Sequence, residues 1–153
     1  MRKMTTTLVA LASLFTATVN FADTTTGTDD NDVILAGHDA VAYFTENRPV
    51  PGSADFTVSY DGAIYRFASA ANRDRFRSDP ARYAPVYGGY CAFGTSIGKK
   101  FQVDGQAFEV VDGRLYVNKN LKVYGTWRKD IPGNIAKADG HWPKIRTIPA
   151  DQL

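Results

Sequence analysis

Residues 56–67 read FTVSYDGAIYRF, and this stretch decides the fold. Apolar and polar residues alternate on both sides of Asp61-Gly62, which is the pattern of half-buried β-strands. Asp-Gly between two alternating runs is the strongest short-range signal of a two-residue hairpin, because both residues accept a positive φ. The sequence therefore predicts antiparallel strands over residues 56–60 and 63–67.

A helix is predicted directly after this hairpin, over residues 70–78. Ser69 is a favourable N-cap, because its hydroxyl can accept a hydrogen bond from the first helical turn. The helix must end before Pro80, whose ring does not fit a helix interior. Asp79 before Pro80 is itself typical of a helix start, which predicts one further turn through Ala84.

The same pattern recurs 51 positions later in the chain. Five of the nineteen positions from 61 to 79 are identical after this shift, whereas ordinary residue frequencies give about one. The recurring features are strands over 108–111 and 114–117 around Asp112-Gly113, an N-cap at Asn120 and a helix over 121–129. We expect two hairpin-plus-helix units that superpose with Asp61 on Asp112 and Phe76 on Trp127. The alternative is that unrelated hairpins share the same turn residues.

These units predict a single small α+β domain with a mostly antiparallel sheet, because two-residue hairpins join antiparallel strands. The domain is expected to cover residues 33–145. Its last part is predicted to be a helix that starts at Pro132 and stops at Trp142-Pro143, with the Trp ring capping the core. Residues 146–153 are expected to form a C-terminal tail.

The N-terminal residues 1–22 are predicted to be a secretory signal peptide. Arg2 and Lys3 precede an apolar run over 8–19 that is too short to span a bilayer, and a cleavage point follows Ala22. The alternative is an uncleaved anchor. Residues 23–32 are acidic and polar, so a flexible leader is expected there. The mature protein should be periplasmic or secreted, with no membrane span after signal removal.

Charge and motif content exclude several classes of function. The chain of 153 residues has 18 Lys and Arg and 16 Asp and Glu, and removal of Arg2 and Lys3 leaves no net charge. No nucleic-acid partner is therefore expected, because such proteins need a one-sided basic excess. The sequence has no phosphate-loop, dinucleotide, C-x-x-C or Ser-His-Asp motif. We leave open whether the protein is an enzyme and favour a protein that is not one.

Cys91 lies in the glycine-rich segment YGGYCAFG over residues 87–94 and is the only cysteine. It cannot form an internal disulfide, and an unpaired thiol in an exported protein is a candidate functional group. Lys99 and Lys100 could lower its pKa. A functional site predicts a partly accessible thiol with a His, Tyr or Lys side chain in hydrogen-bond reach. The alternative, a cysteine that only fills space, predicts complete burial.

Other side chains could complete a site around this thiol. Tyr43, Tyr87 and Tyr90 are predicted ligand-binding residues, with core packing as the alternative. His38 is a predicted metal ligand together with Cys91, because a Cys, a His and an oxygen donor suit copper or zinc. A neighbouring carboxylate at Asp39 could orient the imidazole. The alternative for His38 is a local hydrogen bond in a loop.

Four segments resemble those of a known family. They are HDAVAYF at 38–44, YRFASAANRDRF at 65–76, DPARYAPVYGGYCAFG at 79–94 and DIPGNIAKADGHWPKI at 130–145. In these segments the chain resembles the exported bacterial YHS-domain proteins. The resemblance implies an association with metal handling, because wider YHS domains accompany heavy-metal transport ATPases and oxygenase components. The cysteines of the metal-associated pattern are replaced here by Ala42, Ala68 and Asn72.

Three functions follow as hypotheses. The leading one is an exported module that binds a small molecule or a metal through Cys91. The second is a thiol-dependent redox protein, which could form only mixed or intermolecular disulfides because it has no second cysteine. The third is a non-catalytic structural or interaction protein.

Overall fold

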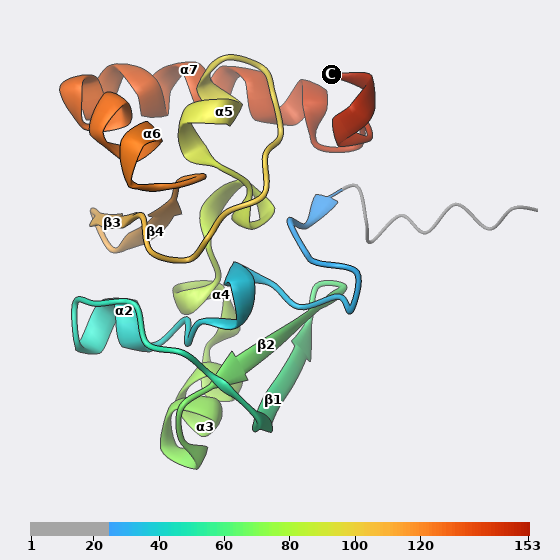
Figure 1. Cartoon of the computed structure of the whole chain (residues 1–153), viewed down its shortest axis with the longest axis vertical. Helices are drawn as coiled ribbons and strands as arrows, with labels where there is room; N and C mark the ends of the chain where they lie inside the picture. The colour runs from blue at the N-terminus through green and yellow to red at the C-terminus, as the bar shows by residue number, and fades with distance from the viewer. Residues whose placement is uncertain (1–24) are drawn as a thin grey trace, which may run out of the picture.

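Two β-hairpins, each followed by a helix, organise the chain (Figure 1). The computed structural model describes residues 25–153, so the predicted signal peptide lies outside the described residues. In chain order the elements are α2 (Ala42–Thr45), β1 (Ser53–Tyr60), β2 (Ala63–Phe67), α3 (Ala70–Ser78), α4 (Pro80–Tyr83), α5 (Ala92–Ser96), β3 (Phe108–Val111), β4 (Arg114–Val117), α6 (Leu121–Trp127) and α7 (Ile131–Ile145). Helices and antiparallel strands share one domain, which confirms the predicted α+β class.

The turns of the two hairpins have the same backbone conformation. Asp61-Gly62 has φ angles of 50° and 77°, and Asp112-Gly113 has φ angles of 50° and 74°. Positive φ at both central residues is what a two-residue hairpin turn of this type requires. The predicted turn chemistry is therefore confirmed at both positions.

The strands form two separate antiparallel sheets of two strands each, not one continuous sheet. The register repeats after 51 residues, because Val58 pairs with Tyr65 and Glu109 pairs with Tyr116. Each sheet also receives a parallel bridge from an upstream residue, Val33 to Ile64 in one case and Pro85 to Leu115 in the other. We therefore call residues 33–83 the first unit and residues 85–145 the second unit.

Each helix packs on its own hairpin through aromatic rings at equivalent positions. The rings of Phe76 and Tyr65 lie 4.5 Å apart at an interplanar angle of 34°. The rings of Trp127 and Tyr116 lie 5.7 Å apart, also at 34°. Phe76 and Trp127 are both fully buried. Equivalent ring pairs therefore join each helix to its own hairpin, and the superposition of the two units stays a prediction.

Both predicted N-caps start their helices. The Ser69 hydroxyl accepts a hydrogen bond from the Asn72 N–H at 3.1 Å, and the Asn120 amide oxygen accepts one from the Val123 N–H at 3.0 Å. Helix α3 has the predicted bounds. Helix α6 ends earlier than predicted, and a 3-10 turn continues from its end to Asp130.

The last helix does not stop where the sequence predicts. Helix α7 is capped by Asp130, whose carboxylate accepts a hydrogen bond from the Gly133 N–H at 3.0 Å. It passes through Pro143 and ends at Ile145. Pro143 cannot donate to the carbonyl four residues earlier, but the Arg146 N–H still reaches the Trp142 carbonyl at 2.9 Å. Loss of one bond in the last turn is therefore tolerated.

The predicted flexible leader differs from the structure over residues 25–32. Thr26 and Thr28 are only 4% and 6% exposed. The Gly27 N–H donates to the Gly88 carbonyl at 2.8 Å, and the Gln102 amide donates to the Thr28 carbonyl at 2.8 Å. The acidic composition concealed this pairing, which uses the backbone and therefore leaves no hydrophobic pattern in the sequence.

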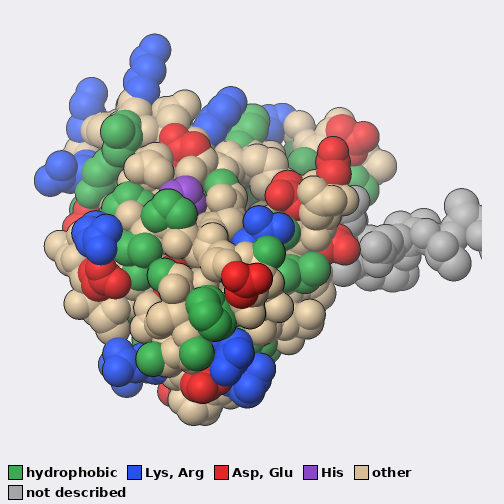
Figure 2. Space-filling view, turned by 60° about the horizontal axis from the view of Figure 1, so that its bottom comes forward, with side chains coloured by type: hydrophobic (Ala, Val, Ile, Leu, Met, Phe, Trp, Pro, Cys, Tyr) green, Lys and Arg blue, Asp and Glu red, His purple; other side chains and the backbone are tan. Residues whose placement is uncertain are grey.

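In Figure 1 the hairpin of the first unit and helix α3 lie at the bottom, and α5, α6 and α7 form the top. The surface in Figure 2 shows hydrophobic side chains scattered between charged ones of both signs. Within residues 25–153, no helix combines the length and the apolar character that a membrane span needs.

Candidate functional site

The Cys91 thiol is buried and hydrogen-bonded. Its exposed fraction is 0%. The sulfur accepts a hydrogen bond from the Gly94 N–H at 3.3 Å and donates to the Asn118 amide oxygen at 3.6 Å. The same amide oxygen accepts from the Phe93 N–H at 3.0 Å. The expectation of a partly accessible thiol is therefore wrong, because Cys91 is the N-cap of α5 and its sulfur faces the first turn of that helix.

Burial raises the pKa of the Cys91 thiol, and nearby backbone N–H groups oppose this shift without cancelling it. The opposing N–H groups belong to Gly94, Lys119 and Phe93. A raised pKa leaves less thiolate at neutral pH than an ordinary cysteine has. The geometry thus disfavours the thiol-dependent redox hypothesis.

We predict that Cys91 reacts with iodoacetamide about 100-fold or more slowly in the folded protein than in urea, because the thiol must first be exposed by an opening of the structure. The label reports on one site, since the chain has one cysteine. The rate should be followed between pH 6 and pH 10 by mass spectrometry. Fast labelling of folded protein near pH 7 would contradict the buried, protonated thiol.

Cys91 occupies the position that Asp39 occupies in the first unit. In each unit a run of three residues with positive φ ends two positions before this residue. Before Asp39 the run is Leu35, Ala36 and Gly37, with φ angles of 58°, 49° and 79°. Before Cys91 it is Tyr87, Gly88 and Gly89, with φ angles of 53°, 61° and 81°. Each of the two residues also donates its N–H across to a later segment, Asp39 to the Val50 carbonyl and Cys91 to the Phe101 carbonyl. The repeat therefore extends upstream of the hairpins, here with a shift of 52 residues.

Asp39 is a buried carboxylate surrounded by N–H donors. Its exposed fraction is 0%. One oxygen accepts from the N–H groups of Val41 and Ala42 at 2.9 and 3.2 Å. The other accepts from the Ala68 N–H at 2.9 Å and from the Asn72 amide at 2.8 Å. The carboxylate thus joins α2 to the start of α3, and it does not orient His38 as the sequence suggested.

His38 is held by two hydrogen bonds of its own. Its Nδ1 lies 3.1 Å from the Leu35 carbonyl, which can only accept, so we place the proton on Nδ1. The Nε2 lone pair then accepts from the Gln106 amide nitrogen at 3.0 Å. The ring is 9% exposed. Both ring nitrogens are engaged within the protein, which favours the local structural role over metal ligation.

The three predicted ligand-binding tyrosines are buried, at 0% for Tyr43, 5% for Tyr87 and 3% for Tyr90. The Tyr43 hydroxyl donates to the Gly105 carbonyl at 2.7 Å. The Tyr87 hydroxyl donates to the Asp139 carboxylate at 2.8 Å, and burial is the main cause of the raised pKa of this phenol. The Tyr90 ring carries the Lys100 ammonium 5.0 Å above it. These contacts are those of core residues whose polar groups find partners.

The structure does not assemble the predicted metal site. Across residues 25–153, no three or more His, Cys, Asp or Glu side chains are grouped so as to hold a metal ion. His38 and Cys91 have separate sets of hydrogen-bond partners. Copper or zinc binding by this pair is therefore not supported by the geometry.

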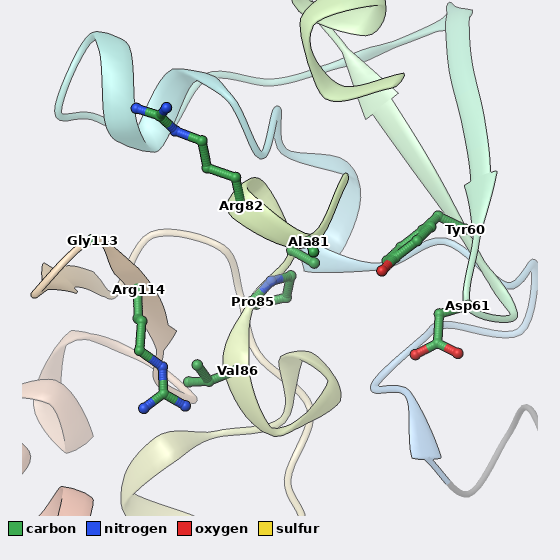
Figure 3. A pocket seen from close by; sticks show the side chains of 9 residues that line it. Tyr60, Asp61, Ala81, Arg82, Pro85, Val86, Gly113 and Arg114 are labelled. Carbon is green, nitrogen blue, oxygen red and sulfur yellow. The ribbon is translucent and has the colours of Figure 1, made fainter. Parts of the chain in front are cut away.

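A cleft lies instead where the two hairpin turns approach the connection between the units (Figure 3). Its volume is about 360 Å³. The lining residues are Tyr60, Asp61, Ala81, Arg82, Ala84, Pro85, Val86, Gly113 and Arg114, and we call this the inter-unit cleft. The sequence predicted a site around Cys91 and named none of the residues that line this cleft as site residues. The sequence feature that could have indicated these residues is the repeated Asp-Gly turn, because both turns lie at this cleft.

The inter-unit cleft has two arginines on one side, the Asp61 carboxylate on the other and an apolar floor. Figure 3 shows Arg82 and Arg114 on one side, Tyr60 and Asp61 on the other, and Pro85 and Val86 between them. The Arg82 guanidinium lies 5.5 Å from the Tyr83 ring, and the Arg114 guanidinium lies 5.6 Å from the Tyr116 ring. In the described part of the chain, neither arginine forms an ion pair with a carboxylate. Figure 3 shows the Arg82 guanidinium pointing away from Pro85 and Val86, whereas the Arg114 guanidinium lies beside Val86, so Arg114 is the cation that an anion in the cleft would meet.

Residues 41–87 match the family model of the YHS domain. The chain therefore contains a YHS domain, as the resemblance implied. Comparisons with curated proteins and with solved structures found no significant match. The matched range begins beside α2 and ends in the glycine-rich segment, so it covers most of the first unit.

Proposed function

We propose that this YHS-domain chain is an exported binding module that holds a small anionic molecule in the inter-unit cleft. The observation that carries the proposal is the position of the cleft, which is formed by both units and by the segment that connects them. Ligand sites favour such boundaries, and about 360 Å³ is within the range of small-molecule pockets. Export rests on the predicted signal peptide.

The lining residues indicate the chemistry of the ligand. Arg114 offers a fixed cation, because its guanidinium is held against the Tyr116 ring. A planar guanidinium recognises carboxylate or phosphate with two parallel hydrogen bonds. Ala84, Pro85 and Val86 add an apolar surface for the body of the molecule. A small organic acid matches this combination better than an inorganic ion does.

The cleft is preferred to Cys91 for a physical reason. A ligand site must present groups that the protein itself has not already satisfied. The Cys91 sulfur and the His38 nitrogens are engaged in internal hydrogen bonds, whereas Arg82 and Arg114 face solvent. The metal association of YHS domains is therefore not transferred to those two residues.

We predict that benzoate binds the cleft and that Arg114→Gln weakens this binding about 10-fold, the value of one charge-assisted hydrogen bond. Benzoate combines a carboxylate with an apolar ring, and benzamide is its neutral counterpart. The amide signals of Val86 and Gly113, which line the cleft, should shift in an NMR titration.

Arg75→Gln is the matched control, because Arg75 is exposed on α3 and does not line the cleft. It should bind benzoate as the parent protein does. Equal shifts with benzamide, or equal weakening by Arg75→Gln, would show that the cleft does not select an anion.

A further inference from the structure

The large hydrophobic side chains exposed among residues 25–153 all belong to the second unit. They are Ile97, Phe101 and Leu121, with exposed fractions of 54%, 38% and 63%. Three exposed lysines, Lys99, Lys119 and Lys122, alternate with them along the chain. We call these six residues the apolar–basic patch.

Tertiary contacts bring the segments of the patch together. A Cβ placed on Gly94 would lie 2.7 Å from a Phe101 ring carbon, so this ring lies directly on α5. The Ile97 N–H donates to the Gly94 carbonyl at 3.1 Å, which places Ile97 at the end of the same helix. The ammonium of Lys119 lies 5.0 Å from the centre of the Phe101 ring. Leu121 follows two residues later as the first residue of α6.

The backbone supports the same arrangement. The Asp104 N–H donates to the Lys119 carbonyl at 3.2 Å, so the segment after Phe101 runs beside the segment before α6. Helix α5 also packs against α6. The patch is therefore one surface region built from two chain segments.

The charge of the patch has one sign. The stretches 91–103 and 113–129, which supply all six residues, contain no Asp or Glu. Within the described part of the chain, the three lysines of the patch form no ion pair. The rest of the surface differs, because Asp74 pairs with both Arg73 and Arg77 in the first unit. Asp104, which is exposed, borders the patch, and an occupant that is apolar in part and negatively charged would complement the six patch residues.

We propose that the apolar–basic patch docks the protein onto an anionic lipid surface. Apolar side chains that stand between lysines are suited to a bilayer interface, where the rings and methyl groups enter the headgroup region and the ammonium groups meet lipid phosphates. The three apolar side chains come from separate positions of the chain, and each is at least 38% exposed. They therefore suit a fluid surface, which needs no shape complementarity. The predicted export would place the protein beside such a surface. This proposal does not depend on a ligand in the inter-unit cleft.

The test is co-sedimentation with vesicles, using the protein purified after export. Vesicles of phosphatidylcholine and phosphatidylglycerol in equal amounts should retain the protein, and pure phosphatidylcholine vesicles should not. Binding should weaken steeply between 0.05 and 0.5 M NaCl, because exposed charges are screened. The variant Ile97→Ser/Leu121→Ser should bind about 10-fold more weakly, because burial of apolar surface adds to the electrostatic attraction. Both residues are more than half exposed, so the variant should keep its fold.

A second variant, Lys99→Gln/Lys119→Gln/Lys122→Gln, removes three charges from the patch. The matched control, Arg48→Gln/Arg75→Gln/Arg77→Gln, removes three exposed charges from the first unit. Only the first of these variants should lose binding. Equal losses, equal binding to both vesicle types, or no binding would overturn the proposal. Release of the protein from vesicles by polyglutamate, with unchanged vesicle binding of the serine variant, would indicate an acidic protein partner instead.

Discussion

Asp39→Asn is expected to lower the free energy of unfolding by about 3 kcal/mol, because it leaves two buried N–H donors without an acceptor. The Asp39 carboxylate accepts four hydrogen bonds, two on each oxygen. In asparagine one oxygen becomes an NH₂ group. That group would face either the α2 donors or the pair formed by Ala68 and Asn72. The shape of the side chain hardly changes, so the loss reports on hydrogen bonding and charge and not on packing.

The measurement is urea denaturation followed by circular dichroism. Asp30→Asn is the control, since Asp30 is exposed and should change the unfolding free energy by less than about 0.5 kcal/mol. A loss at Asp39 no larger than that of the control would mean that the buried carboxylate does not hold α2 and α3 together. The structural equivalence of the Asp39 and Cys91 positions would then have no consequence for stability.

Local chemistry made the hairpins and caps predictable. Asp-Gly requires a backbone that few other turns share, and Ser69 and Asn120 satisfy N–H groups within three residues of themselves. These interactions depend on neighbours in the chain, so the sequence contains all the information that they need. The repeat was visible for the same reason, because its identities are concentrated in turns and caps.

The burial of Cys91 could not be predicted from the sequence in the same way. Burial depends on what packs against a residue, and here the covering group is Asn118, which lies 27 positions away. The backbone shows an equivalence that sequence identity does not. Aligning Leu35-Ala36-Gly37 with Tyr87-Gly88-Gly89 places Cys91 on Asp39, a position that accepts backbone N–H groups in both units. The hairpin shift of 51 residues conceals this match, because the upstream segments differ by one residue.

The cores of the two units differ in polarity. The first unit places Phe67 against Phe76, with ring centres 5.1 Å apart. Counted at the hairpin shift, the second unit has Asn118 and Trp127 at these positions. In the described part of the chain, the Asn118 amide nitrogen and the Trp127 indole nitrogen are buried without a hydrogen-bond partner. Because an unpaired buried donor is costly, the second unit loses stability that the first unit retains.

Trp127→Ala is expected to lower the free energy of unfolding by about 3–5 kcal/mol, the usual cost of deleting a fully buried large aromatic side chain. Trp127 has an exposed fraction of 0% and joins α6 to the second hairpin through Tyr116. It also packs with α7, because Ala138 of that helix belongs to the same buried cluster as Trp127. The removed ring would therefore leave a cavity that three elements border.

The variant Trp127→Phe distinguishes the contribution of the aromatic ring to stability from that of the indole N–H. Phenylalanine keeps the aromatic contact with Tyr116, removes the unpaired N–H and reproduces the residue of the first unit at Phe76. It should cost less than about 1.5 kcal/mol, because the smaller cavity is offset by the loss of a buried donor. Denaturation should be followed both by circular dichroism and by the fluorescence of Trp142, which remains in each variant. Coincident transitions with a large loss for alanine alone are the expected result. Equal losses for alanine and phenylalanine would instead mean that the indole N–H has a partner, and that the second core depends on it.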